Sequence, residues 1–329
     1  MTTSVQQRIK AYIQKVQAIK QEIQKVIVGQ DEIIRFVLIA LFSEGHVLLE
    51  GVPGLGKTML IRTLGQALEL HFSRIQFTPD LMPADIMGTE ILSDDDGKRA
   101  FHFQPGPVFA NLVLADEINR APPKTQSALL EAMQERTVTV AKKTYTLDPP
   151  FFVMATQNPL EMDGTYPLPE AQLDRFFFKV MVTSPDENTL SQIFTRTTGS
   201  EIQTASHIAS ADDVIVIGKI ARHVAVPSHL NDYVARLITR THPGNDDSLP
   251  GVKKYIRYGA SPRGGQSIIL GAKVNALLEG RYNVAFDDVR TVAHAALRHR
   301  ILLNFEGQAE EIDPDTVITE ILESIPFDI

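Results

Sequence analysis

The sequence predicts an α/β domain built on a parallel β-sheet, joined to a smaller all-helical domain. Up to about residue 183, short apolar segments alternate with segments of helical spacing, a pattern typical of parallel βαβ units. A glycine-rich turn over residues 51–56 connects the first of these apolar segments to a helix. After Ser184-Pro185 the strand pattern stops. We therefore expect a core domain over residues 1–185 and a helical domain over residues 186–329.

Two helices are expected before the first strand. Residues 5–26 place apolar side chains three and four positions apart, which indicates an amphipathic helix. Gly29 interrupts this pattern, and Asp31 is placed to cap a second helix that runs to about Ser43. No secretory signal pattern is present, and the longest apolar run, 36–42, is far below the ~18 residues that span a bilayer. We expect no membrane insertion and a cytoplasmic location.

Five short segments are expected to form one sheet. They are residues 46–50, 73–77, 111–115, 151–155 and 176–182. All but the second are continuously apolar, as strands covered on both faces are. Further elements expected are helices over 57–70, 124–135, 186–196, 211–224, 228–241, 263–279 and 286–302, and a hairpin over 137–147. Residues 78–106, rich in Asp, Pro and Gly, are expected to contain short ordered pieces at most.

Composition restricts the chemistry. The 329 residues carry 32 Lys and Arg against 40 Asp and Glu, so the net charge is −8 and general attraction to nucleic acid is not favoured. The absence of cysteine excludes disulfides, thiolate nucleophiles, iron–sulfur clusters and cysteine-bound zinc.

Residues 51–58, Gly-Val-Pro-Gly-Leu-Gly-Lys-Thr, match the phosphate-binding pattern G-x-x-x-x-G-K-[ST]. The turn lies between a strand and a helix, where backbone N–H groups and the helix dipole favour a phosphate. Lys57 would reach the β- and γ-phosphates, and the Thr58 hydroxyl would bind Mg²⁺. An ordinary glycine-rich loop is the alternative. The expected nucleotide contacts are Gly51, Pro53, Gly54, Leu55, Gly56, Lys57, Thr58 and Met59.

Two further strands end in polar residues, at the edge where α/β sheets bind ligands. Asp116 and Glu117 follow the apolar run that ends at Ala115. Asp116 would hold Mg²⁺ through water and Glu117 would polarise the attacking water, although adjacent acids are also common at solvated strand ends. Asn158 follows another apolar run, where it would point at the γ-phosphate or merely cap the turn before Pro159.

With these residues in view, the chain resembles the MoxR family of AAA+ ATPases from residue 26 to about residue 265. The resemblance is carried, in the family's order, by GVPGLGKT (51–58), LVLADEINRAPPKTQSALLEAMQE (112–135), ATQNP (155–159), LPEAQLDRF (168–176) and GASPRG (259–264). It implies a P-loop core whose strands are ordered 5-1-4-3-2, with a smaller all-α lid.

The resemblance also assigns roles to individual residues. Asp116 and Glu117 become the Walker B pair, and Asn158 becomes sensor 1. Arg175 matches the arginine finger that reaches the γ-phosphate of a neighbouring subunit, unless it forms an ion pair with Asp174. Arg263 matches sensor 2, and whether it acts on its own nucleotide or on a neighbour's stays open.

Other segments have weaker assignments. Val28, Gly29 and Gln30 match the segment that lines the adenine pocket, although Gly29 serves equally well as a helix terminator. Residues 78–106 and 137–147 resemble inserts of the clade that includes magnesium chelatase, which face a central pore or partners. Plain surface loops are the alternative.

The function implied by the resemblance is ATP hydrolysis with Mg²⁺ in a homo-oligomeric ring, expected to be a hexamer. The implied role is chaperone-like maturation of metalloenzymes or protein complexes, with a partner that carries a von Willebrand factor A domain. The protein client is not identified. Two other classes are a DNA-acting motor of the same fold and a nucleotide switch without turnover, which Glu117, Asn158 and Arg175 argue against.

The DNA-acting alternative has one local feature in its favour. Tyr255 and Tyr258 interleave with the basic residues Lys253, Lys254, Arg257 and Arg263, as in small nucleic-acid patches. The same pattern fits a lid edge or a solvated face, and the net charge of −8 makes nucleic acid a disfavoured partner.

Overall fold

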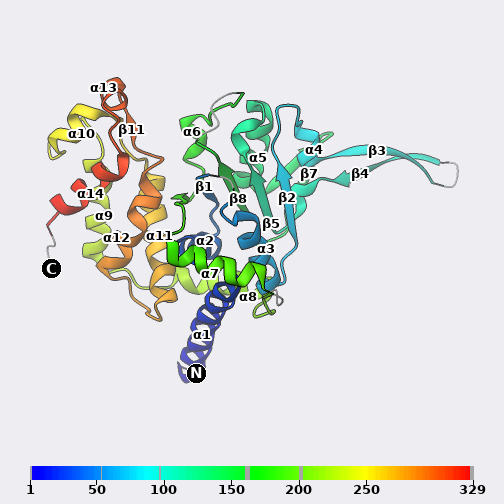
Figure 1. Cartoon of the computed structure of the whole chain (residues 1–329), viewed down its shortest axis with the longest axis horizontal. Helices are drawn as coiled ribbons and strands as arrows, with labels where there is room; N and C mark the ends of the chain where they lie inside the picture. The colour runs from blue at the N-terminus through cyan, green and yellow to red at the C-terminus, as the bar shows by residue number, and fades with distance from the viewer. Residues whose placement is uncertain (1, 53, 96–97, 160–163, 200–202, 327–329) are drawn as a thin grey trace.

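The computed structural model describes residues 2–52, 54–95, 98–159, 164–199 and 203–326. A sheet with flanking helices occupies the middle of the molecule, with a group of helices on one side and a long hairpin projecting on the other (Figure 1). Within the described ranges, no helix combines the length and the apolarity that crossing a bilayer requires.

The central sheet has five parallel strands in the order β2-β5-β8-β1-β9. Their bounds are β1 (Val47–Glu50), β2 (Phe72–Gln76), β5 (Leu112–Asp116), β8 (Phe152–Gln157) and β9 (Phe178–Met181). Numbered by their order in the chain within this sheet and taken from β9, these strands run 5-1-4-3-2. The predicted α/β core and its strand order are therefore confirmed.

Successive side chains along β1, β5 and β8 enter two separate cores, because strand residues alternate between the faces of a sheet. On β1, Val47 and Leu49 belong to one buried cluster and Leu48 belongs to the other. The first cluster includes α1 (Thr2–Val26), α2 (Asp31–Phe42) and α3 (Lys57–Leu68). The second includes α4 (Pro83–Met87) and α5 (Pro123–Glu135). Burial on both faces explains the continuously apolar strands.

The carboxyl-terminal part is mainly helical. Its helices are α7 (Glu187–Thr198), α8 (Ala211–Arg222), α9 (Ser228–Arg240), α10 (Pro250–Tyr255), α11 (Pro262–Leu278), α12 (Phe286–Leu297), α13 (Phe305–Ala309) and α14 (Pro314–Ser324). The expected helix over 286–302 ends earlier, at Leu297, because Leu302–Leu303 form strand β11, which pairs with β10 (Ile256–Tyr258). Helices α10, α13 and α14 were not anticipated from the sequence.

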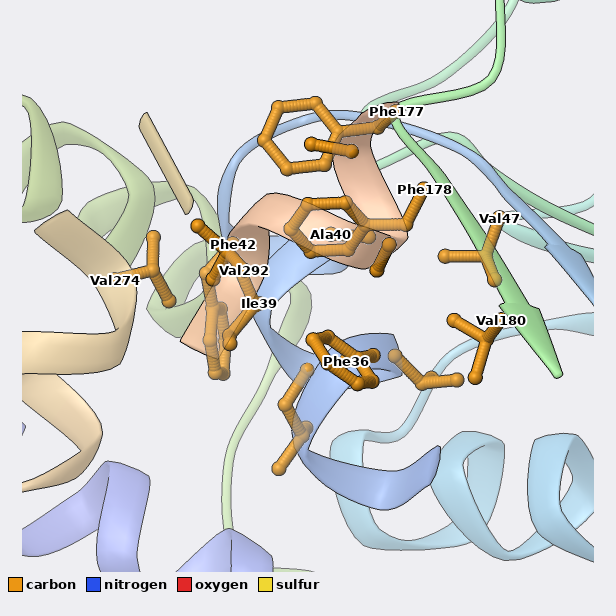
Figure 2. Packing of buried hydrophobic residues seen from close by; sticks show 14 of the residues in the cluster. Phe36, Ile39, Ala40, Phe42, Val47, Phe177, Phe178, Val180, Val274 and Val292 are labelled. Atoms are coloured by element: carbon orange, nitrogen blue, oxygen red, sulfur yellow. The ribbon is translucent and has the colours of Figure 1, made fainter. Parts of the chain in front are cut away.

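The helical part shares a core with the sheet. Phe178 of β9 packs edge-on against Phe36 of α2, with ring centroids 5.4 Å apart. Figure 2 shows this pair beside Phe42, with Val274 of α11 and Val292 of α12 reaching the same cluster. A Cβ at Gly271 of α11 would lie 2.9 Å from the Phe178 ring, so the glycine allows this close approach. Strand β9 is therefore in direct contact with the helical part.

The expectation of short ordered pieces over 78–106 was wrong. The segment forms a two-stranded hairpin of β3 (Gly88–Asp95) and β4 (Lys98–Pro105), which projects from the body of the molecule (Figure 1). Phe103 of β4 stacks on Tyr145 at 4.0 Å, and Tyr145 comes from the expected hairpin of β6 (Thr137–Val140) and β7 (Lys143–Thr146). The two hairpins therefore support each other at their bases.

Four short helical segments complete the elements of the described chain. Two are 3-10 turns, η1 (Pro107–Phe109) and η2 (Ile118–Arg120), and the α-helix α6 (Glu170–Leu173) precedes β9. Helix α4, which leads into the projecting hairpin, is the fourth. Segment η2 directly follows the acidic end of β5, and α6 directly precedes the Asp174-Arg175 pair.

Candidate nucleotide-binding site

The loop between β1 and α3 has the backbone shape that a phosphate-binding turn requires. Gly54 and Gly56 have φ values of +85° and +74°, a region that residues with a Cβ rarely adopt. Gly51 lies so close to the chain after β9 that a Cβ there would meet the Val182 carbonyl oxygen at 2.5 Å. The predicted contact Pro53 lies outside the described residues.

A cavity of about 400 Å³ opens at the carboxyl edge of the sheet, between this loop and the ends of three strands. It is lined by Gly51, Gly54, Gly56, Lys57, Thr58, Met59, Arg74, Asp116, Glu117, Thr156, Gln157 and Asn158. The structure thus brings together most of the residues predicted for the phosphates and for the reaction. Asn158 is 7% exposed, so this amide is largely enclosed where it borders the cavity.

Lys57 is held across the glycine-rich turn. Its Nζ donates a hydrogen bond to the carbonyl oxygen of Gly51 at 2.8 Å. Burial lowers the pKa of Lys57, and the nearby carboxylates of Asp116, Glu117 and Glu50 oppose that shift. The nearby carboxylates therefore favour the charged ammonium group, and this positive charge is what would attract an anionic phosphate.

Thr156 at the end of β8 links the two acidic residues. Its hydroxyl donates to Oδ1 of Asp116 at 2.6 Å and accepts the backbone N–H of Glu117 at 2.8 Å. The side chain is 2% exposed, so both bonds are shielded from water. Glu117 has a φ of +56°, an uncommon value that turns the chain directly after the strand. Thr156 was not singled out in the sequence.

Two polar side chains from β2 reach the same acids. Nη2 of Arg74 donates to Oδ2 of Asp116 at 2.7 Å. Nε2 of Gln76 donates to Oε2 of Glu117 at 2.9 Å, and Nη1 of Arg120 donates to the same oxygen at 2.8 Å. Sequence reasoning missed Arg74 and Gln76, although the alternation Arg-Ile-Gln over 74–76 indicates a strand with one polar face.

A second cavity, of about 560 Å³, lies on the other side of the loop and is mostly apolar. Among its lining residues are Val28, Gln30 and Leu55, and it shares Gly54, Gly56 and Met59 with the first cavity. Nε2 of Gln30 donates to the carbonyl oxygen of Leu55 at 2.6 Å, which ties the segment before α2 to the phosphate loop. Together the cavities offer one region for phosphates and one for an apolar ring.

Helix α7 supplies the far wall of the apolar cavity with Leu190, Ile193 and Phe194. These residues were not predicted, because they belong to the helical part and their spacing suggests only an amphipathic helix. Gly29 has a φ of +69°, and a Cβ there would overlap Thr189 at the start of α7. Helix α1 already ends at Val26, so the turn around Gly29 also brings the chain close to α7.

Arg175 and Arg263 stand apart from these cavities. Within the described residues, neither side chain lines the phosphate or the apolar cavity. Asp174 does not pair with Arg175: its carboxylate binds Arg300 at 2.7 Å and lies 3.7 Å from Arg263. No ion pair of Arg175 is found in the part of the chain that the structure describes.

The residues predicted for Mg²⁺ have suitable chemistry. Thr58 and Asp116 border the same cavity and offer a hydroxyl and a carboxylate, the hard oxygen ligands that Mg²⁺ prefers. Among the hydrogen bonds of the described residues, Oδ2 of Asp116 binds only Arg74, and this pair is partly open to solvent. The donor set therefore fits the ion.

The chain matches two family models. Residues 46–178 match the model described as "ATPase family associated with various cellular activities (AAA)", and residues 251–321 match an AAA lid domain. A crystal structure of a presumed ATPase from Cytophaga hutchinsonii superimposes with a TM-score of 0.93 at 41% identity, covering 99% of this chain and 98% of that one. Fold and site thus define an AAA+ ATPase with a helical lid.

Relatives that match over most of their length assign the chain to one family within the AAA+ ATPases. The chain is 45% identical to Chaperone MoxR1 of Mycobacterium tuberculosis, over 92% of this chain and 80% of the relative. It is 42% identical to the uncharacterised protein YeaC of Bacillus subtilis, over 93% and 92%. It is 33% identical to Protein MoxR of Methylorubrum extorquens, over 93% of each. The chain belongs to the MoxR family of AAA+ ATPases.

Proposed function

We propose that this chain binds ATP with Mg²⁺, hydrolyses it, and uses the cycle to remodel other proteins. One observation carries the proposal: Lys57, Thr58, Asp116 and Glu117 border a single cavity at the carboxyl edge of the sheet. A cation for phosphates, oxygen ligands for a divalent ion and a carboxylate for water are the parts that phosphoryl transfer needs.

In this proposal each residue has a separate task. Lys57 would leave the Gly51 carbonyl and bind the β- and γ-phosphates. Thr58 and Asp116 would hold Mg²⁺, which supplies neutralisation of phosphate charge when bound. Glu117 would accept a proton from the attacking water, and Asn158 would help to orient that water. Gln76 and Arg120 both donate to Oε2 of Glu117 in this structure, so Oε1 is the oxygen that would accept the proton from water.

The apolar cavity would hold the adenine ring. Val28 and Gln30 would form one wall, with Gly29 in the turn between them, and the apolar side chains of α7 would form the other. Because α7 begins the helical part, nucleotide binding would connect the two domains, whose boundary we place between residues 185 and 186. Hydrolysis would then move the helical domain against the core.

Arg175 would complete the site of a neighbouring copy. It lies outside both cavities of its own chain, within the described residues, and AAA+ ATPases commonly oligomerise. We therefore propose a homo-oligomeric ring, with a hexamer as the expected size. Arg263 would act as sensor 2, on its own or a neighbour's nucleotide.

The client would be a protein or a protein complex, as the name of the chaperone relative suggests. The projecting hairpin exposes Leu92 (54%) and Phe101 (66%), apolar side chains suited to contact with a client or a partner. A partner with a von Willebrand factor A domain remains a prediction from the family resemblance.

The structure offers little support for the DNA-acting alternative. In the basic segment, Lys254 donates to the Tyr255 hydroxyl at 2.8 Å and binds the carboxylates of Glu306 and Glu310 at 3.1 and 3.2 Å, and these bonds raise its pKa. Lys253 donates to the carbonyl oxygen of Asp246. A lysine that already pairs with carboxylates, as Lys254 does, has less to offer a phosphate backbone.

Two variants test the proposal. Lys57→Ala should lose binding of a fluorescent ATP analogue, whereas Glu117→Gln should keep binding and lose turnover by roughly 10²-fold or more. Tight ATP binding by Lys57→Ala would refute the assignment of the phosphate loop. Normal turnover by Glu117→Gln would remove Glu117 as the base.

A further inference from the structure

Arg300, just beyond the end of α12, is a buried guanidinium whose side chain is 2% exposed. All of its N–H groups have acceptors. Nε donates to Oδ1 of Asp174 at 2.7 Å, and Nη2 donates to the carbonyl oxygens of Asp174 at 3.2 Å and Phe176 at 2.7 Å. Nη1 donates to the carbonyl oxygens of Phe177, at 3.3 Å, and of Ala296. A lysine has too few donors, and no planar fork, to reproduce this set.

Most of these acceptors flank one residue, Arg175. The carbonyl groups of residues 174, 176 and 177 lie on both sides of it in the chain, and Arg300 binds all three. His299 adds a bond to the Phe176 carbonyl oxygen at 3.1 Å. The helical part therefore holds the backbone around Arg175 by hydrogen bonds. The Arg175 side chain itself has no ion pair in the described part of the chain.

Asp174 connects these bonds of Arg300 to the segment that carries Arg263. Its carboxylate accepts the Ser261 hydroxyl at 3.1 Å and lies 3.7 Å from Nη1 of Arg263. Ser261 precedes α11, the helix that carries Arg263 in its first turn. The Asp174 carboxylate thus contacts two parts of the lid, the start of α11 and Arg300 after α12.

The cost of burying this arginine indicates that the arrangement is specific. A buried cation is unfavourable unless it is paired and fully hydrogen-bonded, and here both conditions hold. Burial lowers the pKa of Arg300 from its ordinary value, and Asp174 opposes that shift. Gly264 leaves room for the side chain, because a Cβ there would lie 3.2 Å from Cδ of Arg300.

We propose that Arg300 is the positioning residue for Arg175: through the Asp174 carboxylate and the carbonyl groups of residues 174, 176 and 177, the lid sets the direction in which Arg175 is presented to a neighbouring copy. The inference rests on the proposed function, in which Arg175 acts on a neighbour's ATP. Arg300 itself touches neither nucleotide cavity. Its effect on turnover would pass to the next site in the ring, not to its own.

Mixed oligomers separate this role from a general loss of stability. Arg175→Ala protomers keep an intact site and lack the finger, and Glu117→Gln protomers keep the finger and bind ATP without turnover. Each should be inactive alone, and their mixture should hydrolyse ATP. Adding Arg300→Lys to the Glu117→Gln donor should lower the rate of the mixture roughly tenfold or more, because misplacement by about 1 Å can cost 10²-fold. ATP binding by that donor should be unchanged.

Arg298→Lys in the same donor is the matched control. Arg298 is close in sequence and also pairs with a carboxylate, Asp315, but its bond to the core goes to the Lys179 carbonyl, beyond the Arg175 segment. With this donor, the ATP turnover rate of the mixture should stay within about twofold of the rate with the donor that carries Glu117→Gln only. Such a change is much smaller than the loss that misplacement causes. If Arg300→Lys fails to fold, Asp174→Asn in the donor removes the charge that fixes the guanidinium and should lower the rate in the same way.

The outcomes are distinct. If the donor with both Glu117→Gln and Arg300→Lys gives the same mixture rate as the donor with Glu117→Gln only, the positioning role is overturned. The trans assignment then still stands. A Glu117→Gln donor that gives no activity with Arg175→Ala overturns the trans assignment, and the positioning role with it. A mixture rate that falls with the Arg300→Lys donor, and not with the Arg298→Lys donor, supports the inference.

Discussion

Oδ2 of Asp116 lies 2.7 Å from Nη2 of Arg74, so the carboxylate at the end of β5 faces a cation from the neighbouring strand. The strand register explains the approach, because Gln76 pairs with Asp116 and Arg74 lies two residues earlier on the same face. The oxygen proposed to hold Mg²⁺ is therefore occupied by an arginine of the same chain. Mg²⁺ would have to compete with that guanidinium.

Arg74→Met should raise the apparent affinity for Mg²⁺. The pair is partly exposed, with the Arg74 side chain 49% accessible, so its loss should change the affinity by no more than about fivefold. Titration of ATP turnover with Mg²⁺ at fixed ATP measures this. Arg136→Met is the control, since Arg136 pairs with Glu44 at the opposite end of the sheet. An unchanged or weaker Mg²⁺ affinity in Arg74→Met would contradict the competition.

Thr156→Val should reduce turnover while ATP binding persists. The hydroxyl holds Asp116 and the backbone of Glu117 at once, and removing a buried donor that orients a catalytic group costs roughly 1–3 kcal/mol, or about tenfold or more in rate. Thr156→Ser keeps the hydroxyl and should retain most of the turnover. Steady-state kinetics of both variants provide the measurement. Equal rates for Val and Ser would show that the hydroxyl is dispensable.

Phe194→Ala should weaken the binding of ATP and ADP alike, because the side chain would cover the base and not the phosphates. Phe194 is 60% exposed in this structure, so covering that surface would contribute about 1 kcal/mol or somewhat more, close to tenfold in affinity. Titration with fluorescent ATP and ADP analogues tests this. Phe305→Ala is the control, since Phe305 lies on the lid surface and is 86% exposed. A loss confined to ATP would place Phe194 elsewhere.

His46 should make stability depend on pH. Its Nδ1 accepts the backbone N–H of Val153 at 3.0 Å, Nε2 lies 3.0 Å from the Met133 carbonyl oxygen, and burial lowers its pKa to about 4. The folded state therefore favours the neutral ring. Its contribution to stability is complete above the unfolded pKa of about 6.5 and is lost as the pH falls towards 4, up to about 3 kcal/mol.

His46→Gln removes this titration, so its free energy of unfolding should fall less between pH 7 and pH 4.5 than that of the parent. The difference should reach about 2 kcal/mol, and urea unfolding at each pH measures it. His299, whose pKa burial also lowers, leaves part of the dependence in place. The exposed His229→Gln should retain the parental pH dependence. If His46→Gln also retained the parental pH dependence of the free energy of unfolding, His46 would not be the source of that dependence.

Local sequence patterns were sufficient for the central sheet and for the phosphate loop. Strands such as Val47–Glu50 are apolar throughout, and the glycines at 54 and 56 occupy positive φ values that their motif predicts. The projecting hairpin was missed because Phe103 gains its packing from Tyr145, a residue on another hairpin. Such support is invisible in a window of local sequence.

The same reason limited the prediction of the site. Residues within a motif, such as Lys57 and Asp116, could be named from the sequence. Arg74, Thr156 and Phe194 reach the cavities only through strand register and through the packing of α7 beside the loop. These contacts join residues about 40 positions apart or more, and no spacing rule connects them.

In the proposed function, ATP turnover takes place at sites completed between copies of this chain. The direct test is the rate per protomer across a range of protein concentrations, with Glu117→Gln as the blank. Sites shared between copies predict a specific rate that rises with concentration and then levels off as the oligomer saturates. A nonzero rate that stays constant across the range, down to concentrations at which the protein is monomeric, would contradict it.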